Sequence, residues 1–442
     1  MTDRILGFST DTYAHRRAKV LEKLGDGAMI LSSAPVLFRS RDTEFRYRPD
    51  SELFYLTGCT LPGVVAVLRG GVDEGRFVLF VPSRNLKEEV RSGPRMGPAE
   101  AQEMFGAEKV FPLENLGEEL PKLLRKPRRL FFRLGGSTRL ETLVVEALRF
   151  GRQRGPRKGD GPRGVEDPGQ ILDDLRIRKE PEEVSRIREA TSLTVVSFRG
   201  ALEGARPGMG EWEVESLLEA GFRSGGGQGP AFPTIVGSGK NACTLHYSAN
   251  EHTIDDGDLI LLDGGAEVGL YCGDVTRTFP ANGRFSSRQR ELYSVVRAAH
   301  RSALEMLRPG NEVAQIHWAA SAVLTQGLVD LGVLDGKVED LIETKAHEPY
   351  FPHQTSHWLG LDVHDVGDYA HGGSPRLLEP GMVLTVEPGL YFPAAEGEDP
   401  GPFAGMGIRI EDDVLVTEEG FENLTGSLPV DLEGLEELLA RE

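Results

Sequence analysis

The sequence is poor in cysteine and has no long apolar run. Its three cysteines, Cys59, Cys243 and Cys272, lack the spacing of a zinc knuckle and the even number of a disulfide framework, which favours a reducing compartment. No segment approaches the ~20 apolar residues that a membrane span needs. The first nineteen residues are polar and contain no apolar core of a secretory signal. We therefore expect a cytoplasmic protein with no membrane partner.

Basic residues are also in deficit. The 442 residues include 50 Lys and Arg against 69 Asp and Glu, a formal charge of −19. Non-specific nucleic-acid binding needs Lys and Arg to neutralise phosphates, so we expect no nucleic-acid partner. Residues 121–163 are an exception, with 13 basic against three acidic residues. They could form an anion-binding surface, but a solvated helix face followed by a linker is the favoured interpretation.

Histidine is almost absent from the first half of the chain. Of ten histidines, only His15 precedes residue 246. A metal site or an acid–base site should therefore lie in the C-terminal part.

The N-terminal part has the pattern of a mixed α/β domain. Short β-branched runs bounded by Gly, Pro or Asp predict strands, and longer periodic segments predict helices. The expected strands are residues 28–32, 64–68 and 76–81, and the expected helices are residues 99–105, 116–124 and 141–150. Residues 151–170 are rich in Gly, Pro and Arg and predict a flexible linker. The expected domains are 1–172 and 173–442.

Two sequence patterns each occur twice in the C-terminal part. A helix whose apolar residues step by three and four ends at Arg-Pro-Gly 206–208, and a second such helix ends at Arg-Pro-Gly 308–310, an offset of 102. The pattern Gly-(x)5-Asp-x-Gly of residues 257–265 recurs with Glu at 381–389, an offset of 124. Helix, Arg-Pro-Gly, helix and a strand that ends in a carboxylate thus occur twice. We infer a duplicated α+β half, with the site between the halves.

Two aspartates flank a predicted hairpin. If the chain turns between Val268 and Gly269, Asp263 and Asp274 face each other across the two strands. Opposed residues have Cβ atoms roughly 4.5–5.5 Å apart, where two carboxylates repel unless a proton or a cation intervenes. They could be ordinary turn aspartates, but an unpaired charge at the end of an apolar strand is costly, so metal ligands are favoured.

Three histidines fall within twelve residues, at His353, His357 and His364. A single histidine is usually structural, whereas such a cluster favours a metal site or acid–base chemistry.

Two further strands are predicted to carry carboxylates. Glu387 follows an apolar strand at 382–386. In a strand at 407–416, the period of two places Arg409, Glu411 and Asp413 on one face. Taken singly, Glu411 is expected to be an exposed carboxylate beside Arg409.

Taken together, four carboxylates and one imidazole form an oxygen-rich set that suits hard divalent metals. The set favours Mn²⁺, with Co²⁺, Zn²⁺ or Fe²⁺ as alternatives. Five ligands exceed the usual need of one ion, so a site for two metals about 3.5–4 Å apart is the economical interpretation. The candidate ligands are Asp263, Asp274, His357, Glu387 and Glu411.

These residues lie in motifs that resemble the Xaa-Pro aminopeptidases (aminopeptidase P) of the pita-bread metallopeptidase family. The C-terminal motifs are LDGG 262–265, CGDVTR 272–277, TSHWLGLDVHD 355–365, VEPGLY 386–391 and GIRIEDD 407–413. SELFYLTG 51–58 resembles the family's N-terminal domain signature, and TIVGSGKN 234–241 with LHY 245–247 resembles its substrate-side loop. The resemblance implies an α/β N-terminal domain and an α+β pita-bread catalytic domain with pseudo-twofold duplicated halves.

The resemblance also implies roles for the site residues. The five candidate ligands would hold two metals, usually manganese, with Asp274 and Glu411 as bridges. A metal-bridging hydroxide would attack the carbonyl before proline, assisted by Glu387, and release the N-terminal residue of the peptide. Arg409 would orient Glu411. The histidines expected to bind substrate and stabilise the oxyanion are His246, His353 and His364.

Further expectations follow from the same resemblance. The N-terminal domain would serve oligomerisation and substrate access, in a homodimer or homotetramer, and residues 50–57 could contribute to an interface. Gln354 stands where the family pattern has Gly, which bears on the placement of His353. Five histidines match no motif and are expected to be structural or on the surface: His252, His300, His317, His347 and His371.

Several other functions remain open at this point. A prolidase, which accepts only Xaa-Pro dipeptides, shares the metal motifs, and how the N-terminal domain closes the site would separate the two. A silent pita-bread binding protein or a creatinase-like enzyme typically lacks the ligands that are all present here. A two-metal phosphatase uses the same residue types but predicts neither the loop around His246 nor the duplicated half.

Overall fold

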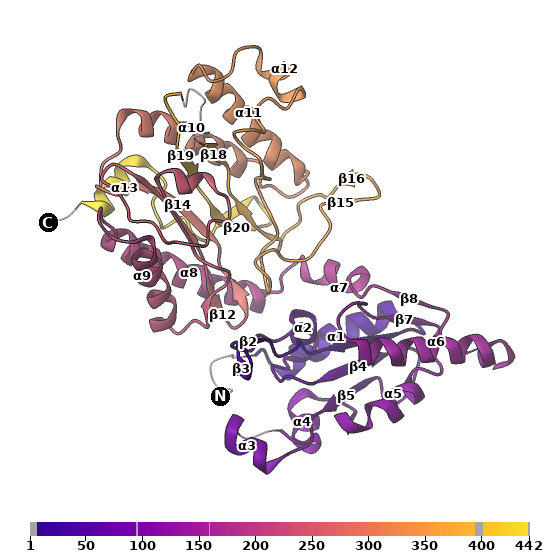
Figure 1. Ribbon diagram of the computed structural model, residues 1–442. Coiled ribbons are helices and arrows are strands. Elements are labelled where there is room, and N and C mark those ends of the chain that lie inside the picture. Colours follow the sequence, from indigo (N-terminus) through magenta and orange to yellow (C-terminus); the bar gives the residue numbers. More distant parts are fainter. Residues whose placement is uncertain (1–6, 94–95, 159, 394–400, 441–442) are drawn as a thin grey trace. The chain divides into compact units, whose positions relative to one another are not determined.

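The chain forms two compact units, Met1–Leu175 and Arg176–Glu442 (Figure 1). The computed structural model describes residues 7–93, 96–158, 160–393 and 401–440. The expected domain boundary, between residues 172 and 173, lies three residues before the boundary of these units. Among the described residues, no helix is both long enough and apolar enough to cross a membrane.

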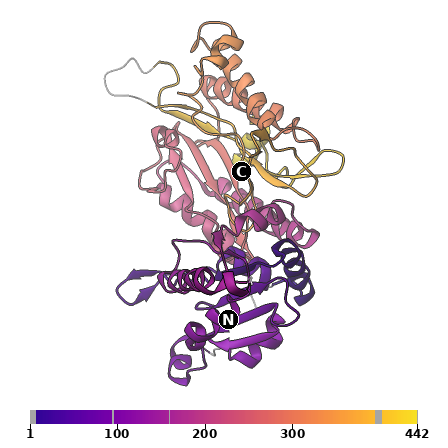
Figure 2. The same ribbon diagram turned by 90° about the vertical axis from the view of Figure 1, so that its right-hand side faces the viewer.

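The first unit is built on a six-stranded mixed sheet with the order β6-β5-β4-β1-β7-β8. β1, β4 and β5 pair antiparallel, while β6, β7 and β8 join in parallel. The β2–β3 hairpin projects from this unit (Figure 2). The strands are β1 (Ala28–Ser32), β2 (Phe38–Ser40), β3 (Thr43–Glu44), β4 (Val65–Arg69), β5 (Phe77–Val81), β6 (Lys109–Pro112), β7 (Arg129–Phe131) and β8 (Gly164–Glu166). The helices are α1 (Thr10–Leu24), α2 (Ser51–Thr57), α3 (Leu86–Ser92), α4 (Pro98–Phe105), η1 (Leu113–Asn115), α5 (Leu116–Leu123), α6 (Thr138–Lys158) and α7 (Gly169–Arg176).

The expected flexible linker at 151–170 is wrong. α6 continues through Lys158, and β8 then adds to the sheet of the first unit beside β7. Gly151 permits this close return of the chain, because a Cβ added there would lie 2.4 Å from the carbonyl oxygen of Pro162. Glycine and proline in this segment thus serve packing, a use that composition does not distinguish from a linker.

The second unit repeats one arrangement twice. Each half begins with a pair of packed helices, α8 with α9 and α10 with α11, and continues into antiparallel strands. The first half contains α8 (Pro181–Gly204), α9 (Glu211–Ser224), β9 (Gly229–Pro230), β10 (Ile235–Ser238), η2 (Gly239–Cys243), β11 (Leu259–Gly264), β12 (Ala266–Val268), β13 (Tyr271–Cys272) and β14 (Val275–Pro280). The second contains α10 (Ser287–Leu304), α11 (Ala314–Asp330), α12 (Val338–Glu343), β15 (Ala370–His371), β16 (Ser374–Pro375), β17 (Val383–Val386), β18 (Gly389–Phe392), β19 (Met406–Arg409), β20 (Asp412–Val416), β21 (Phe421–Asn423) and α13 (Leu432–Leu439).

Backbone contacts confirm the duplication residue by residue. Gly208 and Gly310, the glycines of the two Arg-Pro-Gly turns, both have a φ of +86°. The N–H of Gly208 donates to the Ile254 carbonyl at 2.8 Å, and that of Gly310 donates to the Leu378 carbonyl at 2.9 Å. The donors are 102 residues apart and the acceptors 124, the two offsets seen in the sequence. The bridges Gly210–Thr253 and Glu312–Leu377 repeat the relation.

The hairpin between β11 and β14 has a different register from the expected one. Asp263 lies opposite Thr276, because the chain turns between Gly269 and Leu270, both with positive φ. The turn therefore comes one residue later than predicted, and the pairing shifts by two. A shift of two preserves the face of the sheet, so Asp274 remains on the side of Asp263 as its diagonal neighbour.

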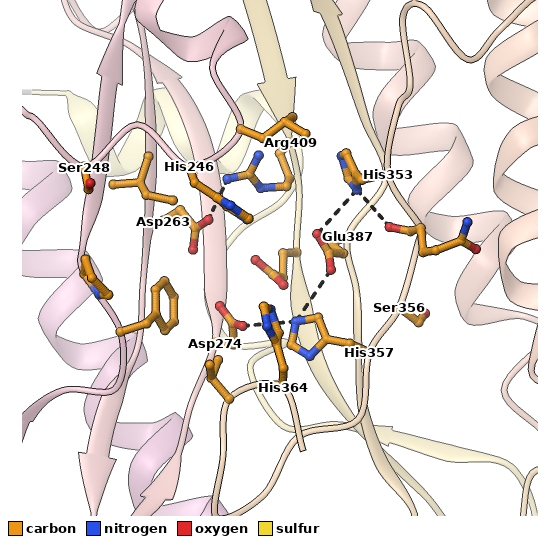
Figure 3. Close-up of a pocket in the computed structure, with 17 residues that line it drawn as sticks. His246, Ser248, Asp263, Asp274, His353, Ser356, His357, His364, Glu387 and Arg409 are labelled. Atoms are coloured by element: carbon orange, nitrogen blue, oxygen red, sulfur yellow. Dashed lines mark hydrogen bonds and ion pairs between the residues drawn. The ribbon is translucent and has the colours of Figure 1, made fainter. Parts of the chain in front are cut away.

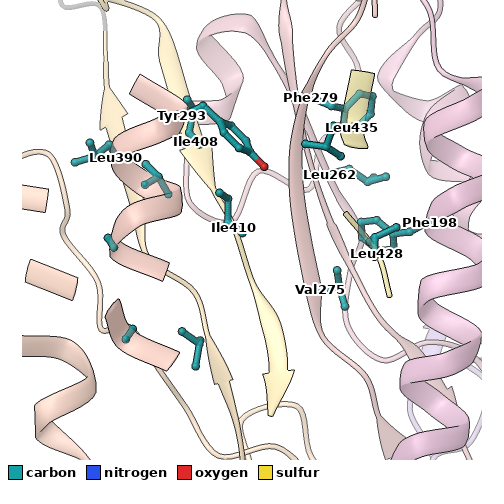
Figure 4. Close-up of a cluster of buried hydrophobic side chains, with 14 of the residues drawn as sticks. Phe198, Leu262, Val275, Phe279, Tyr293, Leu390, Ile408, Ile410, Leu428 and Leu435 are labelled. Carbon is teal, nitrogen blue, oxygen red and sulfur yellow. The ribbon is translucent and has the colours of Figure 1, made fainter. Parts of the chain in front are cut away.

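The strand expected at 407–416 is two strands. β19 pairs with β18 and β20 pairs with β17, so the chain changes partner at Ile410 and Glu411. Ile408 and Ile410 are fully buried in the apolar core of this unit, together with Phe279 and Leu390 (Figure 4). The side chains of Arg409 and Glu411 line a pocket on the other side.

Candidate metal centre

One pocket in the second unit collects every site residue that the sequence singles out. Its volume is about 480 Å³. Figure 3 shows ionisable side chains meeting at its centre, with His246 and Ser248 on one side and His353 and Ser356 on the other. Its lining contains Phe232, Pro233, Ile235, Leu245, His246, Ser248, Asp263, Asp274, His353, Gln354, Ser356, His357, Val363, His364, Glu387, Arg409 and Glu411.

Strand ends place the carboxylates. Asp263 lies near the end of β11, Asp274 directly precedes β14, and Glu387 follows β17. Glu411 occupies the break between β19 and β20, where its N–H donates to the Thr276 carbonyl at 3.1 Å. That bond ties the two halves of the duplication together at the centre of the site.

Three donor groups converge closely enough to share an ion. One oxygen or nitrogen atom from each of Asp274, His357 and Glu411 lies within 4.8 Å of the others. The Nε2 atom of His357 is 3.3 Å from Oδ2 of Asp274 and 3.6 Å from Oε1 of Glu387. Asp263 is held beside this group by Arg409, whose Nη2 atom lies 2.5 Å from Oδ2 of Asp263.

The pKa shifts of the carboxylates are those expected of a cation-binding cluster. Burial raises the pKa of Glu387 to about 7 and that of Asp263 to about 6. Burial and then Asp274 raise the pKa of Glu411 well above its usual range. The buried Oδ1 atom of Asp263 accepts no hydrogen bond from the described residues. Like charges this close ionise together only with a cation between them, so the four carboxylates and His357 fit a divalent metal site.

Arg409 bonds the carboxylate of Asp263, whereas it was expected to orient Glu411. Its guanidinium bonds Asp263 directly, while its Nε atom donates to Oγ1 of Thr276 at 3.1 Å. That hydroxyl donates to Oε2 of Glu411 at 2.6 Å. Arg409 therefore orients Asp263 directly and reaches Glu411 only through Thr276.

His353 is locked into one tautomer by its neighbours. Nδ1 lies 2.8 Å from the Gln354 carbonyl, which can only accept, so Nδ1 carries the proton. Nε2 then accepts from the Tyr391 hydroxyl at 2.8 Å, and that oxygen accepts from Nη1 of Arg409 at 2.8 Å. Burial and then Arg409 lower the pKa of His353 to about 3, so the ring is neutral at physiological pH.

The other two substrate-side histidines lie at different depths. His364 packs edge-on against His357 with ring centroids 4.5 Å apart, and burial followed by His357 lowers its pKa. His246 is exposed, on the loop that follows η2. Figure 3 shows His246, His364 and His353 bordering the carboxylate cluster from different sides, so a small substrate in the pocket can touch several of them.

Sequence reasoning missed Tyr391, which links His353 to Arg409. Its signal was available, because Tyr391 lies in the motif at 386–391 and shares a face of β18 with Gly389. Asp413, placed by the period of two beside Glu411, instead accepts from the N–H of Asp274 at 2.9 Å and does not line the pocket. Of the histidines without a motif, His317 bonds Thr355 and His300 lies 3.3 Å from Asp412, so both are structural.

Comparison with known proteins decides the family. The family model "Metallopeptidase family M24" matches residues 185–418, and "Aminopeptidase P, N-terminal domain" matches residues 13–131. The chain belongs to metallopeptidase family M24. Its second unit has the pita-bread fold, and its similarity to Xaa-Pro aminopeptidases over nearly the whole length shows that it is a metallo-aminopeptidase.

Similar proteins cover the whole length. The chain is 40% identical to the Xaa-Pro aminopeptidase of Escherichia coli (strain K12), over 98% of each protein. It is 34% identical to Intermediate cleaving peptidase 55, mitochondrial, of Arabidopsis thaliana, over 98% of this chain and 83% of that one. The solved structure of Pseudomonas aeruginosa aminopeptidase PepP matches with a TM-score of 0.93 and 39% identity, over 98% of both chains.

Proposed function

We propose that this M24 enzyme releases the N-terminal residue from peptides that have proline in the second position. The observation that carries the proposal is the pocket itself, where five candidate metal ligands and several apolar side chains line one small cavity. Relatives named Xaa-Pro aminopeptidase, matched over nearly the whole chain, support this specificity.

Two divalent cations are the proposed cofactor. Asp274 and Glu411 would bridge them, and Asp263, His357 and Glu387 would complete the set. When bound, the cations supply Lewis acidity and a nucleophilic water at neutral pH. We expect manganese first; a zinc-substituted form of Escherichia coli aminopeptidase P has been solved in complex with product, which agrees with Zn²⁺ as an alternative.

Glutamate and histidine side chains of the pocket supply proton transfer and substrate binding. Glu387, at the edge of the cluster within 3.7 Å of Nδ1 of His353, is placed to hold a proton during the reaction. His246 and His364 border the space where the scissile carbonyl would lie, and each can donate a hydrogen bond to its oxygen. His353 was expected to bind substrate, but both of its ring nitrogens are engaged, so it acts instead by fixing Tyr391 and Arg409 and by closing that side of the pocket.

The apolar side chains in the pocket give a reason for a preference for proline. Proline has no N–H to satisfy and presents a compact hydrocarbon ring. Phe232, Leu245 and Val363 line the same pocket as the carboxylates and offer it apolar surface. A residue with a free N–H at this position would bury an unpaired donor, which costs free energy.

The partners and the compartment follow from the same proposal. The partner is a proline-containing peptide, and we expect a homodimer or a homotetramer. All seven residues of α2 (Ser51–Thr57) are buried in the single chain, so the interface would use other surfaces than the expected residues 50–57. The three cysteines are free, which fits the cytoplasm.

Hydrolysis of an Xaa-Pro-Xaa tripeptide beside an Xaa-Pro dipeptide, with and without a chelator, tests the proposal. The expected result is chelator-sensitive release of the first residue from the tripeptide. Cleavage of the dipeptide alone would make the enzyme a prolidase. No cleavage of either peptide by protein with confirmed bound metal would reject peptidase activity and favour a binding role.

A further inference from the structure

A fully buried carboxylate lies outside the metal cluster, at the start of α9. Glu211 is 0% exposed and pairs with no cation in the described residues. It accepts five hydrogen bonds instead. Oε1 accepts from the N–H and hydroxyl of Ser238, both at 2.8 Å, and from the Asn241 amide at 3.1 Å. Oε2 accepts from the Tyr247 hydroxyl at 2.8 Å and the His252 N–H at 2.9 Å.

These five donors come from both ends of one loop. Ser238 ends β10 and His252 closes the loop. Leu245, His246 and Ser248 lie between them in the chain and line the pocket. Tyr247 is the immediate neighbour of His246, and its hydroxyl also accepts from the Asn241 amide at 3.1 Å. The carboxylate thus fixes the start, the middle and the end of the segment that presents His246.

The duplication shows that the fold does not need an acid here. The counterpart of Glu211, 102 residues later, is Val313. Both residues donate their N–H to the equivalent carbonyl, Glu211 to His252 and Val313 to Arg376, at 2.9 Å each. Val313 packs in the apolar core, so a hydrocarbon side chain is compatible with this position in the helix pair. Only the half that carries the His246 loop has the carboxylate.

We infer that Glu211 is a positioning residue that holds the loop of residues 238–252 and thereby sets His246 against the substrate. This rests on the proposed function, because it assigns His246 to substrate binding. Glu211 does not line the pocket and hydrogen-bonds to no candidate metal ligand among the described residues, so it acts through Tyr247 and the loop backbone. A displacement of about 1 Å in a substrate-positioning group can cost about a hundredfold in rate.

Glu211→Gln is the decisive variant. The amide keeps the size of the side chain, but its NH₂ group must face the His252 N–H or the Ser238 N–H, so at least one bond is lost. We expect kcat/KM on an Xaa-Pro-Xaa tripeptide to fall about tenfold to a hundredfold, with the metal-to-protein ratio unchanged. Glu213→Gln is the matched control, because exposed Glu213 only caps the helix at the Gly210 N–H, and glutamine can do the same.

A double-mutant cycle separates positioning from general damage. In a His246→Ala background, Glu211→Gln should have little further effect, because the group that it positions is gone. An equal fold-loss in both backgrounds would overturn the inference, as would unchanged kcat/KM in the single variant. If Glu211→Gln does not fold, Tyr247→Phe removes one anchor of the same loop and should give a smaller loss with the same dependence on His246.

Amide hydrogen exchange provides a readout that does not depend on activity. In metal-loaded Glu211→Gln, the amides of residues 241–252 should exchange about tenfold faster, since hydrogen bonds to a charged acceptor are lost, while β11 stays protected. Unchanged exchange in the loop would overturn the inference. The wild-type enzyme could fail to cleave the tripeptide while the loop amides of Glu211→Gln exchange faster as expected. In that case the proposed substrate is wrong, and the role of Glu211 in holding the loop is retained.

Discussion

Removing the carboxylate of Asp365 should destabilise the second unit. Its side chain is 2% exposed and lies 2.6 Å from Arg176 and 3.0 Å from Lys179, which are themselves 2% and 1% exposed. In Asp365→Asn, Arg176 keeps its bond to Asp362 at 2.7 Å, but Lys179 remains buried without a counter-charge. Breaking a buried pair from one side costs about 3–5 kcal/mol.

The assay is thermal unfolding of metal-loaded protein over a range of pH. At about 2 °C per kcal/mol for a unit of this size, the expected decrease in Tm is about 6–10 °C. Burial alone would raise the pKa of Asp365, but Lys179 and Arg176 together lower it below its usual value. A lowered folded-state pKa gives stability that is complete above the unfolded value of about 3.9 and is lost as the pH falls through the folded value.

The difference in Tm between wild type and variant should therefore be constant from pH 5 to pH 8 and should become smaller below about pH 4. A decrease in Tm under 2 °C, or a difference that does not change with pH, would refute the reasoning. The network also anchors the segment that carries His364, so kcat/KM should fall together with Tm.

Three further changes test the site. Glu411→Ala should strip the metals, because it removes a shared donor, and an unchanged metal-to-protein ratio by atomic emission would count against its bridging role. His353→Ala should keep the metals and reduce turnover at least tenfold, with near-normal rates removing it from the site. Gly265→Ala should prevent the hairpin from closing, because the new Cβ would lie 1.6 Å from the Gly273 carbonyl oxygen. A soluble, metal-binding Gly265→Ala protein would contradict that packing.

Two of the candidate ligands could be found in the sequence because they share a repeated pattern. Asp263 and Glu387 end apolar strands, and the repeat of Gly-(x)5-acid-x-Gly placed them in equivalent halves. The offsets of 102 and 124 recur between the backbone bonds of Gly208 and Gly310, which supports the inferred duplication.

The pairing register of the hairpin between β11 and β14 and the break between β19 and β20 could not be predicted from the sequence. A two-residue turn needs positive φ at both positions, and Leu270 gives no sign that it adopts one. The break at Glu411 depends on two sheets that compete for one segment, which the local alternation cannot show. The roles of Glu211, Tyr391 and Arg409 depend on distances between residues far apart in the chain, such as the contact of Arg409 with Asp263.

The measurement that tests the central claim most directly is a metal titration of the stripped enzyme with a matched pair of tripeptides, Xaa-Pro-Xaa and Xaa-Ala-Xaa. The account predicts release of the first residue from the proline peptide alone, with activity that reaches its plateau at about two Mn²⁺ per chain. Equal cleavage of the alanine peptide would contradict the specificity, and full activity at one ion per chain would contradict the two-metal site.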